Sequence, residues 1–420
     1  MSAPDKESGR SLFGALGPGL VTGAADDDPS GVGTYSQIGA QFGYGLAWTM
    51  LFGFPLLASI QTICARIGAT TGKGIAQNLR QHYPPALLRG VVLLLLAANV
   101  INLGADLGAM GAVLALLIPG PVLVYTAAFG AVSVLLEVLV SYSRYASALK
   151  WTTLSLFAYV GVVFVADVDV AAALRGTLVP SFTFDREHAM ALVAIFGTTI
   201  SPYLFFWQAG QEVEEQHRRH VKPLMISHRR AGAELARIRT DTLIGMGFSH
   251  VVALFIIVAT AATLHAHGVR DIESAAQAAE ALRPIAGNLA FGLFAIGIIG
   301  TGLLAVPILA GSAAYAVSET FGWVEGLDRR PREAKAFYAV IALATLGGIA
   351  LNFIGIDPMK ALYWSAVVNG LLAPPLMVVT MLIASNRKVM GKFAIGRGLA
   401  FGGWLATAVM AAVAATFLLS

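Results

Sequence analysis

The stretch GPGLVTGAADDDPSGVGTYSQIGAQFGY, residues 17–44, decides the fold. It is long enough to cross a bilayer, since a spanning helix needs roughly 20 mostly apolar residues, yet three aspartates and a proline stand in its middle. A charge at the bilayer centre costs at least about 2.5–3.5 kcal/mol, so these carboxylates cannot face lipid. Pro29 removes an intrahelical hydrogen bond, and Gly31 tolerates unusual dihedral angles. We therefore expect the helix to break here and its carbonyl groups to line a cavity inside the protein.

The composition of the whole chain also indicates a membrane protein. Of its 420 residues, 57% are hydrophobic and 12% are charged, whereas soluble domains usually carry about 25% charged residues. So few charges cannot cover the surface of a soluble multidomain enzyme. The single cysteine, Cys64, excludes an internal disulfide and any metal site built from several cysteines.

Long apolar runs predict eleven membrane spans. They are too long and continuous to be strands, and the period-two alternation of a membrane barrel does not appear. The predicted spans are 13–42, 44–69, 89–117, 122–141, 149–167, 187–215, 240–266, 285–321, 334–355, 359–384 and 398–419.

The positions of Lys and Arg predict the orientation. With a cytoplasmic N-terminus, the first tail and the loops after spans 2, 4, 6, 8 and 10 carry most of the 28 basic residues, as the positive-inside rule requires. We therefore expect a multi-pass protein of the plasma (inner) membrane with a cytoplasmic tail at 1–12. The basic residues serve as topology signals in the lipid bilayer, so no binding of nucleic acid is expected. The basic residues that fall on the opposite face in this orientation are Arg175, Arg186, Arg270, Arg283 and Lys360.

Span 6 is interrupted in the same manner as span 1. It reads HAMALVAIFGTTISPYLFFWQAGQEVEE, and Pro202 interrupts it about as far from its start as Pro29 interrupts span 1. Span 1 starts inside and span 6 outside, so we expect two inverted five-helix repeats. Two such interrupted helices are the sequence pointer to a transporter site at the bilayer midplane. The predicted units are 13–167 (helices 1–5), 168–384 (helices 6–10) and 385–420 (helix 11).

Carboxylate and carbonyl oxygens at the breaks predict a cation as the ligand. Oxygen donors suit hard divalent ions such as Mg²⁺, Ca²⁺ and Mn²⁺, and no Cys, Met or His stands beside either break. Mg²⁺ dehydrates reluctantly and usually keeps several waters. A pocket lined by Asp28, small residues and hydroxyl groups therefore fits a partly hydrated ion.

With these motifs the chain resembles the Nramp family of divalent-metal transporters over nearly its whole length. The family's helix-1 motif, Asp-Pro-Gly-Asn, aligns with 28–31, and its helix-6 motif, Met-Pro-His, aligns with 201–203. The resemblance implies an all-α multi-pass membrane protein of the leucine-transporter type, with helices 1 and 6 broken at the midplane and transport by alternating access. Carried over by position, the metal ligands would be the Asp28 carboxylate and the carbonyl groups of Ala25 and Thr198.

Where the sequence departs from the family, it lacks metal-selective and proton-relay groups. The family's metal-binding asparagine is Gly31 here, its soft methionine is Ser201, and two histidines are Tyr203 and Gln208. Asp106 matches the first acid of a proton path whose second acid is absent. With these departures, the chain resembles the branch of Nramp-related magnesium transporters. This resemblance implies transport of partly hydrated Mg²⁺, and of Mn²⁺, without strict proton coupling. The positions of the two former histidines remain candidates for the ion pathway.

Four other polar residues within the spans allow two interpretations each. Asp26 and Asp27 either hold waters of the hydrated ion or only hydrate a vestibule. Asp106 is either a residual relay or a buried, hydrogen-bonded acid. Asn369 in span 10 either binds the ion or its water, or makes an interhelical hydrogen bond.

Three competing functions remain beside this one. A proton-coupled Mn²⁺/Fe²⁺ importer of the main Nramp type is the first alternative, and the missing methionine and histidines speak against it. An amino-acid or sodium symporter would bring a substrate carboxylate against three aspartates. A membrane enzyme would need a nucleophile and a base, and no such constellation appears. We expect a transporter that is not an enzyme, whose divalent metal is its substrate, with no cofactor and no obligate protein partner.

Overall fold

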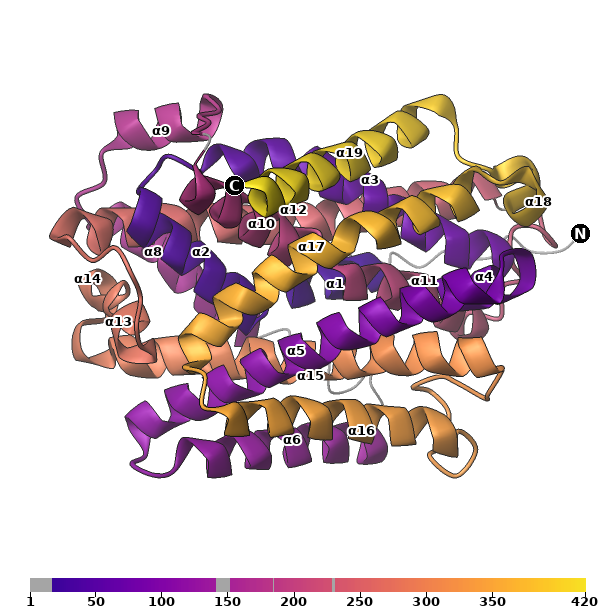
Figure 1. Ribbon diagram of the computed structural model, residues 1–420, viewed down its shortest axis with the longest axis horizontal. Coiled ribbons are helices and arrows are strands. Elements are labelled where there is room, and N and C mark those ends of the chain that lie inside the picture. Colours follow the sequence, from indigo (N-terminus) through magenta and orange to yellow (C-terminus); the bar gives the residue numbers. More distant parts are fainter. Residues whose placement is uncertain (1–16, 141–151, 184, 229–230) are drawn as a thin grey trace, which may run out of the picture.

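The computed structural model describes residues 17–140, 152–183, 185–228 and 231–420, and within these ranges every regular element is a helix. The helices form one bundle, with α4 and α18 at one end and α9, α13 and α14 at the other (Figure 1). The predicted tail at 1–12 lies outside the described residues.

The first half of the chain supplies the central broken helix and the long helices beside it. Its elements are α1 (Pro18–Asp26), α2 (Pro29–Phe42), α3 (Trp48–Thr71), α4 (Ile75–His82), α5 (Pro85–Leu117), α6 (Val122–Leu139), a 3₁₀ turn (Thr152–Leu156), α8 (Phe157–Val165) and α9 (Val170–Leu178).

The second half supplies the other broken helix and five further long helices. Its α-helices are α10 (Arg186–Thr199), α11 (Pro202–Arg218), α12 (Ala231–Thr263), α13 (Ala275–Glu280), α14 (Arg283–Ala286), α15 (Ala290–Phe321), α16 (Lys335–Leu351), α17 (Pro358–Ser385), α18 (Arg387–Met390) and α19 (Arg397–Leu419).

Both predicted breaks are present. α1 ends at Asp26 and α2 begins at Pro29, while α10 ends at Thr199 and α11 begins at Pro202. Each proline occupies the first position of the second half-helix, where a missing N–H leaves no intrahelical bond unmade. The breaks therefore follow from local chemistry.

Nine helical stretches in the described part of the chain are long and apolar enough to cross a membrane. The two remaining predicted spans correspond to the broken pair α1–α2, whose halves are short, and to a shorter apolar helix at Leu154–Val165. The prediction of an all-helical multi-pass membrane protein is confirmed in this form.

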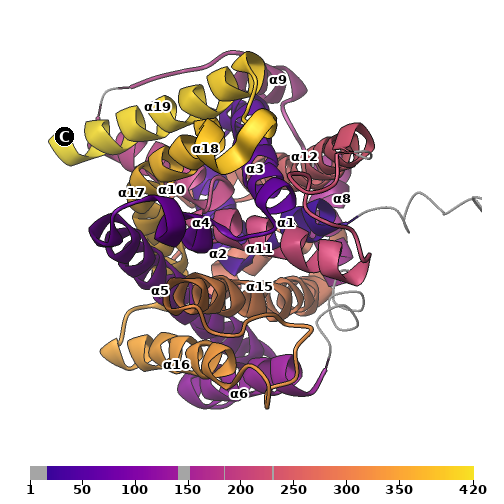
Figure 2. The same ribbon diagram turned by 90° about the vertical axis from the view of Figure 1, so that its right-hand side faces the viewer.

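The two broken helices lie in the middle of the bundle. Figure 2 shows α1, α2 and α11 in its centre, with α3, α5, α12, α15 and α17 around them. α1 packs against α12 and α11 packs against α3, and the first of these contacts is very close. A Cβ atom at Gly23 would collide with the Gly245 carbonyl group, so only small residues allow this crossing.

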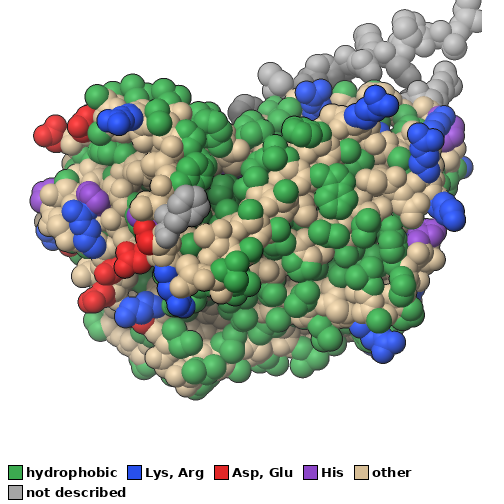
Figure 3. Space-filling model, turned by 45° about the horizontal axis from the view of Figure 1, so that its top comes forward, with side chains coloured by type: hydrophobic (Ala, Val, Ile, Leu, Met, Phe, Trp, Pro, Cys, Tyr) green, Lys and Arg blue, Asp and Glu red, His purple; other side chains and the backbone are tan. Residues whose placement is uncertain are grey.

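We call the end of the bundle that carries α4 and α18 the basic face. The connections between α3 and α5, α11 and α12, α15 and α16, and α17 and α19 lie at this end (Figure 1). In the space-filling view of Figure 3, the acidic side chains in sight lie at the left-hand end together with Lys, Arg and His, whereas the right-hand end shows Lys, Arg and His and no acidic side chain. Hydrophobic side chains occupy much of the surface between the two ends.

The loop between α15 and α16 on the basic face contains a carboxyl group in an unfavourable environment. Burial, reinforced by the nearby carboxylates of Glu319 and Glu214, raises the pKa of Glu325 to about 9, and Arg80 offsets this only in part. The unfolded chain has a pKa near 4.3 for this group. The native state therefore holds a proton that the unfolded state releases, and this group's contribution to stability falls as the pH rises from about 4 to about 9.

We expect Glu325→Gln to raise the apparent melting temperature at pH 8 by roughly 2 °C, on the order of 1 kcal/mol, because partial exposure weakens the effect. The gain should vanish near pH 4, where both states are protonated. Differential scanning fluorimetry at the two pH values measures this, with the exposed Glu333→Gln in the same loop as the matched control. An equal gain at both pH values would contradict the explanation.

Candidate functional site

The two breaks meet around Asp28, whose side chain is 1% exposed. Its Oδ1 accepts a hydrogen bond from the Gly31 amide at 2.7 Å, so Asp28 caps the start of α2. Its Oδ2 accepts from the Tyr203 hydroxyl at 2.9 Å and from the Asn102 amide group at 3.4 Å. All three partners are neutral, so a negative charge on Asp28 would have no counter-ion among these contacts.

Tyr203 joins the two broken helices. Its hydroxyl oxygen lies 2.9 Å from Asp28 and 3.3 Å from the carbonyl oxygen of Ala25, the last but one residue of α1. Sequence analysis placed Tyr203 on the pathway, and the structure places it in direct contact with two of the expected ligands. Since a phenol has one proton, it can donate to only one of the two oxygens at a time, and each oxygen keeps a lone pair available for an ion.

The break of the second helix is held by a hydroxyl group. Ser201 Oγ lies 2.7 Å from the Thr198 carbonyl oxygen and 3.0 Å from that of Gly197. A carbonyl oxygen has two lone pairs, so the Thr198 oxygen can accept this bond and still bind an ion. Among the described residues, Tyr203 is the hydrogen-bonded link from this break to Asp28, and neither Thr198 nor Ser201 is hydrogen-bonded to that carboxylate.

Asp26 and Asp27 turn away from Asp28 toward α12. Ser249 Oγ lies 2.7 Å from Asp26 Oδ2 and 3.1 Å from Asp27 Oδ1. The other oxygen of each carboxylate is buried and has no hydrogen-bond partner among the described residues. One hydroxyl proton cannot satisfy two carboxylates, so this pair needs water, protons or a cation.

A polar chain connects α2, α5 and α17 beside the site. Asn369 donates to Asn102 at 3.1 Å, and Asn102 in turn contacts Asp28. Asp106 Oδ1 accepts from the Ser30 amide at 3.1 Å and from its hydroxyl at 2.9 Å. Asn369 therefore reaches Asp28 through one intermediate, whereas Asp106 holds the start of α2.

Sequence analysis missed Asn102, Ser30 and Ser365. The hydroxyl oxygens of Ser30 and Ser365 lie 2.9 Å apart, which ties α2 to α17 next to the site. Asn102 had a usable signal, because it stands four residues before Asp106 in a mostly apolar helix and the two share one face. The serines had none, since Ser is common in membrane helices.

On the basic-face side of Asp28, Gln208 begins a chain of polar contacts. Its Oε1 accepts from the Thr22 hydroxyl at 2.5 Å, which joins α11 to α1, and its Nε2 lies 3.5 Å from Glu212. Glu212 is buried and pairs with Arg237 of α12 at 2.5 Å. Gln208 therefore lies between the site and the basic face, and its role in an ion pathway stays a prediction.

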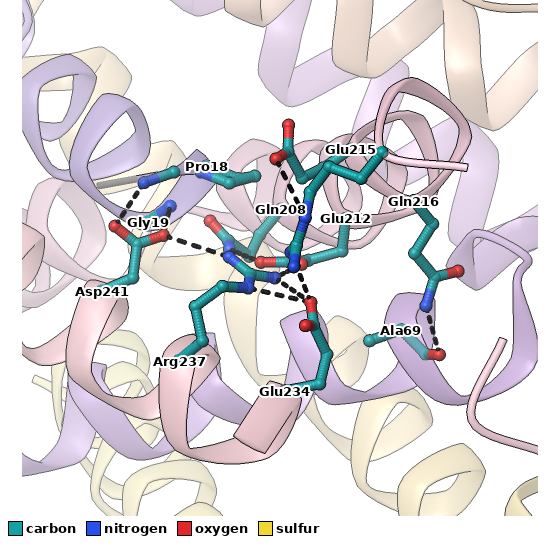
Figure 4. Close-up of polar contacts among 12 residues, drawn as sticks. Pro18, Gly19, Ala69, Gln208, Glu212, Glu215, Gln216, Glu234, Arg237 and Asp241 are labelled. Atoms are coloured by element: carbon teal, nitrogen blue, oxygen red, sulfur yellow. Dashed lines mark hydrogen bonds and ion pairs between the residues drawn. The ribbon is translucent and has the colours of Figure 1, made fainter. Parts of the chain in front are cut away.

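We call Glu212, Glu234, Arg237 and Asp241 the gate cluster (Figure 4). Arg237 Nε lies 2.8 Å from Glu234, which also pairs with Arg219 at 2.9 Å. Asp241 accepts from the backbone amides at positions 17 and 19, at 2.9 and 2.8 Å, and so caps the start of α1. Through these bonds α12 joins both half-helices, α1 and α11, at the basic face.

The opposite side of the site lies under a hollow of about 320 Å³ lined by residues of α2, α10, α17 and the loop at 271–273. Gln37 of α2 spans it, donating to Asp271 at 3.2 Å and accepting from the Ile272 amide at 2.8 Å. Gly33, which also lines the hollow, stands five residues beyond Asp28. On the side facing away from the basic face, the bonds of Gln37 therefore tie α2 to the loop at 271–273.

The sequence matches the model of a known protein family. The family model described as "Nramp: Natural resistance-associated macrophage protein-like" matches residues 19–420. The divalent metal cation transporter MntH of Klebsiella pneumoniae is 24% identical over 412 residues, covering 94% of this chain and 91% of its own. MntH of Mesorhizobium japonicum is 27% identical over 418 residues, covering 96% and 87%.

Solved structures share the fold. The Eremococcus coleocola manganese transporter, in complex with an aromatic bis-isothiourea substituted compound, superposes with a TM-score of 0.75 at 16% identity, covering 98% of this chain and 87% of that one. The inward-facing conformation of Mhp1 gives a TM-score of 0.54 at 13% identity, covering 99% and 94%. The leucine-transporter type of fold predicted from the sequence agrees with both neighbours.

Proposed function

The chain belongs to the Nramp family, and from this premise we propose that it carries divalent metal ions across the plasma membrane by alternating access. Partly hydrated Mg²⁺ is the proposed main substrate and Mn²⁺ the second, without strict proton coupling. The basic face and the N-terminus are proposed to be cytoplasmic, as the excess of Lys and Arg at that face supports. The names of the relatives, which are divalent metal cation transporters, support the class of substrate.

One observation carries the proposal: the buried carboxylate of Asp28, between two broken helices, has neutral oxygen and nitrogen partners and no counter-ion among its contacts. A divalent ion bound to Asp28 and the Ala25 carbonyl would supply that charge, with the Thr198 carbonyl and Ser201 hydroxyl completing the protein ligands. Tyr203 would then give up its bond to Asp28 and donate to a water of the ion.

The absence of large or soft side chains at two positions supports Mg²⁺. Ser201 offers a hydroxyl oxygen where the family has a thioether, and hard oxygen ligands suit Mg²⁺ as well as Mn²⁺. At Gly31 a Cβ atom would stand 3.1 Å from the Asp26 carbonyl oxygen and 3.4 Å from Asp28 Oδ1. With no side chain there, that space is left for a water of hydration.

We also propose that 13–167 and 168–384 are inverted repeats, followed by the last helix at 385–420. In two such repeats, helix 1 corresponds to helix 6, and helix 2 corresponds to helix 7. The packing of α2 on α12 and of α11 on α3, which are the second halves of the two broken helices, supports this correspondence.

Ser201→Met should raise the preference for Mn²⁺ over Mg²⁺ roughly tenfold, because a thioether is a soft ligand that favours the transition metal. The measurement is Mn²⁺ uptake into proteoliposomes in the presence of increasing Mg²⁺. Ser201→Ala is the matched control, since it removes the hydroxyl without adding sulfur and should give no such gain. Equal inhibition by Mg²⁺ in wild type and Ser201→Met would argue against Ser201 as a ligand.

A proton-coupled Mn²⁺/Fe²⁺ importer is the second candidate. It is favoured by Asp106, a buried acid whose Oδ2 has no hydrogen-bond partner among the described residues. A pH dye inside the same proteoliposomes separates the two functions. The proposal expects metal entry without acidification of the lumen, whereas acidification driven by the metal and lost in Asp106→Asn would establish the alternative.

A further inference from the structure

A crevice of about 680 Å³ lies on the outside of the bundle, away from the site at Asp28. Its floor is α3, which packs against α12 on one side and α19 on the other. The lining is mainly apolar, including Phe54, Pro55 and Leu243, and all three helices are candidate membrane spans. The crevice is therefore reached from the lipid rather than from either aqueous side.

The charged groups that line this crevice are two arginines, Arg66 of α3 and Arg239 of α12, and no acidic side chain lines it. Ile238 packs with Ala65 and Ala69, which puts the two arginines at the same depth. Arg66 Nε donates to the Phe393 carbonyl group at 3.0 Å, so its guanidinium group is fixed at the crevice.

These two guanidinium groups have no ionic partner in the described part of the chain. Neither Arg66 nor Arg239 lies within 4.0 Å of a carboxylate there, whereas Arg237 of the gate cluster and the nearby Arg218 and Arg219 are paired. A positive charge near the membrane interface attracts the phosphate of anionic lipids. An anion is thus the missing partner at the end of the crevice.

The length of the crevice matches an acyl chain in one leaflet. From Phe54 to Arg66 it follows α3 for about 18 Å at 1.5 Å per residue. Half of the hydrocarbon core of a bilayer is about 15 Å. Since Arg66 lies near the basic-face end of α3 and Phe54 toward the middle, a lipid with its headgroup at the arginines would extend its chain toward the bilayer centre.

We propose that this crevice binds one anionic phospholipid of the leaflet at the basic face, with its phosphate between Arg66 and Arg239 and an acyl chain along α3. The same helix α12 carries the gate cluster on its other side, through Arg237 and Asp241. A lipid seated against Arg239 therefore contacts the helix that holds α1 and α11 closed. This lipid site is separate from the metal site at Asp28, so its test does not depend on the proposed transport function.

Native mass spectrometry of the full chain in detergent tests this, with dioleoyl-phosphatidylglycerol and dioleoyl-phosphatidylcholine as probes. We expect wild type to retain one phosphatidylglycerol molecule in preference to phosphatidylcholine. The double variant Arg66→Gln/Arg239→Gln should lose that preference by about tenfold or more. Arg89→Gln, an exposed arginine at the start of α5, is the control and should keep it.

A second variant tests the acyl part of the crevice. Thr62→Phe fills the crevice from α3 and should weaken retention of both lipids, whereas Thr240→Phe, on α12 but outside the lining, should not. Excess inorganic phosphate should not displace the lipid. Equal retention of the two lipids by wild type, unchanged preference in the double arginine variant, or displacement by phosphate would each overturn the proposal. A melting temperature close to that of wild type confirms that each variant is folded.

Discussion

Asp28→Ala should reduce metal uptake by at least about 100-fold. Asp28 is the carboxylate that faces the junction of both breaks, and the affinity of oxygen-ligand sites for divalent ions depends on the number of charged ligands. Without it the remaining ligands are neutral carbonyl and hydroxyl groups, which cannot offset the cost of dehydrating the ion. Uptake of Mn²⁺ and Mg²⁺ into proteoliposomes at equal protein content measures the loss.

Two further variants test whether the loss of uptake comes from the loss of the Asp28 charge. Asp28→Asn keeps an acceptor for Gly31 and Tyr203 but removes the charge, and we expect nearly the same loss as with alanine. Asp169→Ala, which removes the exposed cap of α9, should transport normally. Retention of more than about a tenth of wild-type uptake by both Asp28 variants would show that the ion does not bind at this carboxylate.

Arg237→Gln should open the basic face. It leaves Glu212 and Glu234 buried without their shared partner, and breaking a buried ion pair from one side costs about 3–5 kcal/mol. That cost falls on the closed state, where the pair exists, so the balance between closed and open conformations should shift by at least about tenfold. Uptake should slow, because the transporter returns less often to the state open on the opposite side.

Accessibility of Thr22 measures this shift. In a Cys64→Ala background, we expect Thr22→Cys to react with a membrane-impermeant thiol reagent faster from the basic face when Arg237 is replaced. The double replacement Glu212→Gln/Arg237→Gln removes both charges and should restore part of the protection. An unchanged labelling rate in Arg237→Gln would contradict the assignment of the cluster as a gate.

The breaks themselves could be predicted from the sequence because local chemistry dictates them. Pro29 and Pro202 cannot continue a helix, and the aspartates cannot enter lipid, so no distant contact was needed to locate the site. The family resemblance then supplied the positions of Asp28, Ala25 and Thr198. The all-helical bundle followed from the apolar runs alone.

The directions of the side chains at the break could not be predicted. Asp27 leaves helical geometry at φ −87° and ψ 47°, and Asp28 is extended at φ −68° and ψ 171°. Helical periodicity therefore no longer applies, which is why Asp26 and Asp27 face Ser249 while Asp28 faces the opposite break. Contact between Tyr203 and Asp28 likewise depends on how two irregular segments meet.

The gate cluster could not be predicted from the sequence, for a different reason. Span 7 was predicted to begin at 240, but α12 begins at Ala231, because its charged first turns are helical without being apolar. Hydropathy marks only the part of a helix that lies in lipid. Arg237 and Asp241 stand in this transition, and their partners Glu212 and Gly19 are distant in sequence.

Mg²⁺ entry into proteoliposomes, followed with an internal Mg²⁺-sensitive dye, tests the central claim most directly. We predict saturable entry of Mg²⁺ in wild type, competition by Mn²⁺, and no entry above empty vesicles in Asp28→Ala. If vesicles in which the wild-type protein takes up Mn²⁺ showed no entry of Mg²⁺, the proposed substrate would be wrong, and the chain would be a transporter for Mn²⁺ that excludes Mg²⁺.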